Sequence, residues 1–132
     1  MSSFIKISVL TSILIYVSSC GKSDPAEIRA RNNLPDPSYV AEGHRGQTLY
    51  RDNCGLCHGV GLQGTQKGPP LTHKTYLENH HADIAFFWAI KRGVVQHHWK
   101  FGNMPAQPQV SAEQSADIIA YVRQVQKKKG NR

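Results

Sequence analysis

Three segments of the chain repeat their apolar residues three and four positions apart, the spacing of one face of an α-helix. The first runs from about Glu42 to Asn53, and the second from about His81 to Arg92. Gly93 follows the second segment where a C-terminal cap belongs. The third segment begins at Ser111. No alternation of apolar and polar residues is long enough to predict a β-strand, so the pattern favours helices.

The third segment carries the clearest helix signals. Ser111 and Gln114 form a capping box, a serine at the cap with a glutamine three residues later. An apolar stripe follows, made of Ile118, Tyr121, Val122 and Val125. Arg123 and the run Lys127–Lys129 lie toward the negative end of the helix dipole. We expect the lysine run to be a solvated helix end.

The chain begins with an apolar run, Ile7–Val17, after a single charged side chain, Lys6. A run of about eleven residues suits a signal peptide and is too short to span a membrane. It is followed by Val17-Ser-Ser-Cys20, which resembles the bacterial lipoprotein box, in which the cysteine is acylated and becomes the new N-terminus. We therefore predict a lipoprotein signal peptide over 1–19 and lipidation of Cys20. The alternative is ordinary cleavage near Ser19.

Residues 21–42 are rich in proline, glycine, asparagine, aspartate and serine. At this density such residues are expected not to sustain a helix. We predict a flexible tether over 20–42 and a folded domain over 43–129.

Charge narrows the choice of partner. The formal net charge is +7, and removing residues 1–19 deletes one basic residue, Lys6, and leaves +6. A positive balance favours acidic partners such as anionic lipid or an acidic redox protein, although it also simply aids solubility. Nucleic acid is disfavoured, because the chain has no interleaving of aromatic and basic residues and no zinc-finger or helix-turn-helix pattern.

The residues Cys54-Gly-Leu-Cys57-His58 match C-x-x-C-H, the attachment motif of c-type haem. Two thiols on one helical turn reach the two vinyl groups of one porphyrin, and the adjacent imidazole is a suitable iron ligand. Two thioethers and a lipidated Cys20 would also leave no free thiol in an exported protein with three cysteines.

Two other interpretations of the cysteine pair are a thioredoxin-type dithiol and half of a zinc site. The first lacks a preceding strand and a βαβ context. The second lacks another cysteine pair and would need an ordered pair of histidines. The haem interpretation also suits an exported chain, because haem c is attached outside the cytoplasm.

The order of several short blocks resembles class I cytochromes c across residues 43–126. The blocks are Gly46-x-x-x-Tyr50-x-x-x-Cys54-x-x-Cys57-His58-Gly59, Gly68-Pro69-Pro70-Leu71, Asn103-Met104-Pro105-Ala106 and Ile119-Ala120-Tyr121-Val122-Arg123. The resemblance implies an all-α cytochrome c fold: three main helices, with crossing N- and C-terminal helices, around one covalent haem c. Gly46 would then allow a close approach to the last helix near Tyr121, and Tyr50 would fill the gap beside the crossing.

The same resemblance assigns the haem ligands. His58 and Met104 would ligate the iron, and the Pro69 carbonyl would accept a hydrogen bond from the His58 imidazole. A soft thioether favours ferrous iron, and Met104 is the only methionine besides Met1. His97 and His98 precede Met104 by six and seven residues, so they are rival ligands.

Histidines are unusually frequent between residues 73 and 98. One interpretation is a second metal site, of copper or zinc, with ligands from His80, His81, Asp83, His97 and His98. The alternatives are solvated histidines or hydrogen bonds to haem propionates, to which Trp99 and Lys74 would also donate.

An iron held by two protein ligands has no open position for a substrate, so we expect electron transfer rather than enzymatic catalysis. The predicted function is a single-electron carrier in the bacterial periplasm. It would be lipid-anchored to an inner or outer membrane and would meet redox proteins with acidic docking surfaces. The alternatives are a fixed haem subunit of a larger reductase or oxidase, and a haem peroxidase or gas sensor.

Overall fold

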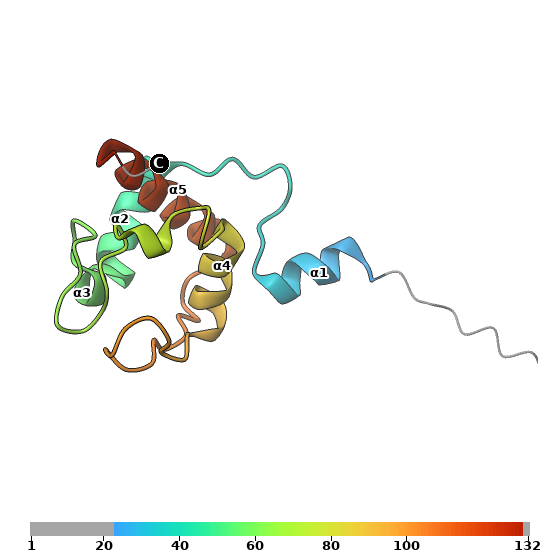
Figure 1. The fold of residues 1–132 in the computed structure, drawn as a ribbon. Helices are drawn as coiled ribbons and strands as arrows, with labels where there is room; N and C mark the ends of the chain where they lie inside the picture. Colours follow the sequence, from blue (N-terminus) through green and yellow to red (C-terminus); the bar gives the residue numbers. More distant parts are fainter. Residues whose placement is uncertain (1–22, 131–132) are drawn as a thin grey trace, which may run out of the picture.

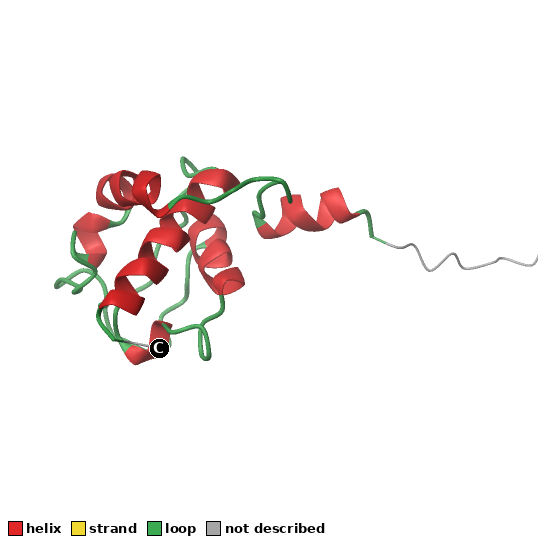
Figure 2. Ribbon diagram, turned by 90° about the horizontal axis from the view of Figure 1, so that it is seen from above, coloured by secondary structure: helices red, strands yellow, loops and turns green. Residues whose placement is uncertain are grey.

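The computed structural model describes residues 23–130 (Figure 1). Within this range the chain forms a short 3₁₀ helix, η1 (Lys74–Tyr76), and five α-helices: α1 (Pro25–Asn32), α2 (Gly43–Asn53), α3 (Gly55–His58), α4 (Asp83–Arg92) and α5 (Ala112–Lys128). Figure 2 shows that these helices are joined by loops, and no strand occurs in the described range. The expected all-α fold is confirmed. The predicted signal peptide and Cys20 lie outside the described residues.

The three helices predicted from apolar spacing correspond to α2, α4 and α5. At the start of α5, the Ser111 hydroxyl accepts from the Gln114 amide at 3.2 Å, and Gln114 Oε1 accepts from the Ser111 amide at 2.9 Å. The capping box is therefore confirmed. No helix in residues 23–130 is both long and apolar enough to cross a bilayer.

The prediction that residues 21–42 cannot sustain a helix is wrong for α1. Pro25 occupies the first turn, where a proline loses no helical hydrogen bond. The Asp24 side chain caps the helix by accepting from the Ala26 amide at 2.9 Å. Asn33 ends it in the left-handed conformation, with φ of 57°.

Tertiary contacts hold the C-terminal end of α1 against α4. Trp88 Nε1 donates to the Asn32 side-chain oxygen at 2.9 Å, and Arg92 donates to the Arg31 carbonyl at 3.0 Å. Lys91 donates to the Ala30 carbonyl. Cations of α4 thus satisfy the unpaired carbonyls at the end of α1, a stabilisation that local composition does not reveal.

The closest helix contact joins α2 to α5, which lie side by side in Figure 1. A Cβ atom added to Gly46 would lie 1.9 Å from the Asp117 carbonyl oxygen and 3.0 Å from Tyr121 Cβ. The ring of Tyr50 is fully buried and lies 5.5 Å from that of Tyr121. The close approach expected at Gly46 is therefore confirmed, and Tyr50 packs beside it.

A buried carboxylate reinforces this crossing. The Asp117 side chain, 3% exposed, accepts from the Glu42 amide at 2.7 Å, from Tyr39 Oη at 2.9 Å and from Arg45 Nε at 2.9 Å. Burial alone raises the pKa of Asp117, but these hydrogen bonds outweigh it and hold the pKa below its ordinary value of 3.8. Asp117 of α5 therefore supplies the cap that the start of α2 lacks.

Arg123 lies inside the protein, where it links α5 to the segment before α4. Its guanidinium donates to Asp83 Oδ1 at 2.8 Å, to the Tyr76 carbonyl at 2.6 Å and to the His81 carbonyl at 2.5 Å. It also lies 4.8 Å from the centre of the Phe86 ring. Arg123 is therefore a structural residue, in contrast to Lys127–Lys129, which are exposed as expected.

We predict that Gly46→Val lowers the free energy of unfolding by at least about 1–3 kcal/mol, because α2 and α5 must separate to admit the side chain. Urea denaturation of the haem-loaded protein measures the change. Gln47→Val, at an exposed position of the same helix, controls for helix propensity. Equal midpoints for the two variants would contradict the crossing.

We also predict a pH-dependent stability contribution from Asp117. Because its pKa is lower in the folded chain, this carboxylate stabilises the fold above its unfolded pKa, and the contribution is lost as pH falls through the folded pKa. Asp117→Asn should therefore unfold more easily than the wild type at neutral pH, and the gap should narrow below about pH 4. Denaturation at several pH values measures this. The exposed Asp52→Asn is the control, and a gap that is constant with pH would contradict the assignment.

Candidate functional site

The cysteine motif occupies one helical turn at the end of α2. Cys54 closes α2 by donating its amide to the Tyr50 carbonyl at 2.7 Å, and the His58 amide donates to the Cys54 carbonyl at 2.9 Å. Gly59 ends α3 with φ of 77°, a conformation that favours glycine. Both cysteines are half-buried free thiols, and burial raises the pKa of Cys54 to about 11.

His58 is held by a hydrogen bond from its ring. Its Nδ1 lies 2.9 Å from the Pro69 carbonyl oxygen, and since a carbonyl only accepts, Nδ1 carries the hydrogen. Burial lowers the pKa of His58, with the Pro69 hydrogen bond opposing that shift. The imidazole is therefore neutral at neutral pH, and Nε2 keeps its lone pair for a metal.

The loop that presents Pro69 is packed directly against the cysteine turn. A Cβ atom on Gly68 would lie 2.9 Å from the Cys57 carbonyl oxygen, and the Thr65 hydroxyl donates to the same oxygen at 2.6 Å. Gly64 turns the loop with φ of 80°. These contacts set the position of the Pro69 carbonyl relative to His58.

Met104 lies in the loop between α4 and α5. Its amide and carbonyl form a pair of 2.9 Å hydrogen bonds with the backbone of Val94. Gly93 has φ of 75°, and a Cβ atom there would lie 2.4 Å from the Met104 carbonyl oxygen. The backbone of Met104 is therefore held against the end of α4.

The haem candidates converge on one cavity of about 390 Å³, with a lining that is mostly apolar and aromatic. Its walls include Cys54, His58, Pro69 and Met104, which come from three separate loops and turns. Cys57 belongs to the same turn as Cys54 and His58 but is not part of the lining. The sequence did not identify most of the other residues that line the cavity, such as Tyr76 and Phe86, because they belong to no motif.

Two observations test whether a haem fits this cavity. The donor set fits, because two thiols and a neutral imidazole share one helical turn and Met104, which carries a thioether, lies in the cavity wall. The apolar and aromatic walls suit a large apolar porphyrin. Trp99 and Tyr76 of this wall also interact with each other: burial raises the pKa of Tyr76, and the indole N–H of Trp99 opposes this shift.

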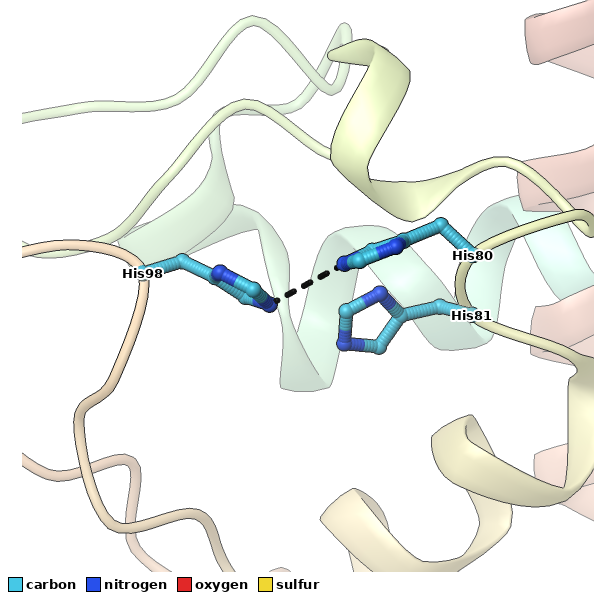
Figure 3. A group of neighbouring side chains, drawn as sticks. All are labelled: His80, His81 and His98. Carbon is cyan, nitrogen blue, oxygen red and sulfur yellow. Dashed lines mark hydrogen bonds between the residues drawn. The ribbon is translucent and has the colours of Figure 1, made fainter.

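Only part of the histidine-rich segment comes together in the fold. His80, His81 and His98 come together, as Figure 3 shows. Asp83, predicted to join them, is instead paired with Arg123. His73 packs edge-on against Trp99, with ring centres 5.1 Å apart.

A C-x-x-C-H turn beside an apolar cavity is typical of haem-binding proteins. Comparison with known protein families agrees. The family model described as "Cytochrome c" matches residues 43–126, so the chain belongs to the cytochrome c family. Members of this family bind haem and carry electrons. Comparison with curated proteins and with solved structures found no match.

Proposed function

We propose that the protein is a single-electron carrier with one haem c, bound covalently through Cys54 and Cys57 and ligated by His58 and Met104. The observation that carries this proposal is the shared cavity, which brings Met104 from a distant part of the chain to the turn that holds Cys54 and His58. The bound haem supplies the one-electron couple of its iron.

The residues around the cavity have distinct tasks in this proposal. The Pro69 carbonyl keeps the His58 hydrogen on Nδ1 and leaves the Nε2 lone pair free to bind the iron. The backbone pairing of Met104 with Val94 holds the thioether loop in place. With His58 and Met104 as protein ligands, the iron would have no open position for a substrate, which favours electron transfer. Apolar walls exclude water and favour the less charged, reduced state.

Exposed side chains near the C-x-x-C-H motif indicate where a redox partner would dock. Leu56 and Val60 are 75% and 63% exposed on either side of His58. Lys67 and Lys100, also exposed, lie in the loops that carry Pro69 and Met104. Exposed apolar residues that flank the motif, together with exposed lysines in the loops that carry Pro69 and Met104, suit transient contact with redox proteins that have acidic docking surfaces.

The proposal also places the protein in the bacterial periplasm, anchored to a membrane by a lipid on Cys20. The support comes from the apolar run and the lipoprotein-like box at the N-terminus. The helix α1 and the segment that follows it would then separate the anchor from the cytochrome domain.

Covalent attachment is tested by denaturing the protein after maturation in a host that attaches haem c. Wild-type protein should keep its haem in acid-acetone, and the double variant Cys54→Ala, Cys57→Ala should release it or fail to take it up. Cys20→Ala is the matched control: it should keep the haem and lose only a radiolabelled fatty acid. Haem extracted from the wild type would overturn the attachment.

Methionine ligation is tested through the backbone next to Met104. We predict that Gly93→Ala weakens or removes the long-wavelength sulfur-to-iron band of the oxidised protein, because the new Cβ displaces Met104. Gly130→Ala has the same positive φ of 75° but meets nothing within 4 Å and lies outside the cavity lining, so it should keep the band.

The visible spectrum of the wild-type protein distinguishes an electron carrier from a peroxidase or gas sensor. The sulfur band with sharp reduced bands supports the electron carrier. A high-spin spectrum, with rapid carbon monoxide binding by the reduced protein, would favour a peroxidase or gas sensor instead.

A further inference from the structure

The strongest feature that the haem attachment does not use is a cluster of imidazoles formed by His80, His81 and His98 (Figure 3). The three residues offer one nitrogen each, and these nitrogens all lie within 4.8 Å of one another. His80 and His81 precede α4, and His98 belongs to the loop after it. The cluster is therefore a product of the tertiary fold. We propose that it binds a divalent transition-metal ion of the zinc or copper type.

The spacing of the donors suits such an ion. Zinc–nitrogen bonds are about 2.0–2.1 Å long, so two nitrogens on a tetrahedral zinc lie roughly 3.3–3.4 Å apart. His80 Nε2 and His98 Nε2 are 3.4 Å apart. Figure 3 shows these two rings directed at each other with His81 beside them. Small side-chain rotations would bring the third nitrogen to the same distance.

His81 is already fixed in the orientation and tautomer that a ligand needs. Its Nδ1 donates to the Thr75 carbonyl at 2.6 Å, which leaves Nε2 as the free donor atom. Its own carbonyl accepts from buried Arg123 at 2.5 Å, and its ring packs on Tyr76. This anchoring distinguishes His81 from a solvated histidine, whereas His80 and His98 are exposed and accessible to a metal ion from solvent.

Carboxylates weaken the repulsion between Arg123 and a cation at the cluster. Arg123 acts on His81 as a fixed positive charge, but it is paired with Asp83 at 2.8 Å and approached by Glu78 at 3.9 Å. Three imidazoles and no carboxylate favour zinc or copper over magnesium or calcium, which prefer oxygen ligands.

His97 is adjacent but differs from the three. Its ring centre lies 4.3 Å from that of His98, but it is not one of the residues whose nitrogens converge. Three protein ligands leave one position of a tetrahedral ion for water or an exchangeable group.

The site lies at the rim of the haem cavity, because His81 and His98 line that cavity and His80 does not. It shares no residue with the haem attachment proposed above. The site is therefore compatible with the ligation by His58 and Met104 proposed above, whereas ligation of the iron by the rival His98 would remove one of its three donors.

The test is calorimetric titration of the haem-loaded protein, made without a polyhistidine tag and treated with a chelator, with Zn²⁺. We expect one saturable site, and no such site for Mg²⁺. His80→Asn and His98→Asn should each lower the zinc affinity by at least about 100-fold, since loss of a mere supporting partner costs 10–100-fold.

Two control variants show whether the loss of zinc binding is specific to the cluster. His44→Asn, at an exposed position on α2, and His97→Asn should both retain zinc binding within a few-fold of the wild type. An unchanged visible spectrum establishes that each variant is folded. The proposal is overturned if zinc shows no saturable binding, if His80→Asn and His98→Asn bind as the wild type does, or if the loss follows His97 alone.

Discussion

The backbones of α2 and α5 touch, and this contact positions both the core and the haem motif. Only glycine fits at position 46, because the Asp117 carbonyl occupies the space of a side chain. This contact places Tyr50 in the core, where its hydroxyl donates to the Gly59 carbonyl at 2.9 Å. Since Gly59 ends the cysteine turn, the helix crossing also positions the haem motif.

Two buried charged residues of α5 position two further segments of the chain. Asp117 accepts hydrogen bonds from the start of α2 and from Tyr39, so it orders the chain that enters the domain. Arg123 donates to carbonyls before α4, so it orders the histidine-rich segment and one wall of the cavity. Breaking such a buried network leaves an uncompensated charge, which is far costlier than losing a surface pair. One helix thereby connects the entry segment, the haem turn and the imidazole cluster.

The two proposed metal centres differ in how the chain builds them. The haem attachment residues are local, within one turn, and only Met104 and Pro69 arrive from other loops. The imidazole cluster combines the segment before α4 with the loop after it, because that loop brings His98 next to His80 and His81. A cation there would lie beside the haem cavity, at the surface where His81 and His98 form the wall.

Features that depend on local spacing could be predicted from the amino-acid sequence alone. These are the three helices α2, α4 and α5, the capping box, the cysteine–histidine turn, and, through the resemblance to a family, the glycine at the crossing. The other features arise from contacts between distant segments. The helix α1 depends on cations of α4, Arg123 proved to be buried, and Asp83 pairs with it instead of joining the histidines. The physical reason is that local propensity is encoded within a few residues, whereas the partner of a buried charge or imidazole is chosen by distant segments that folding brings together.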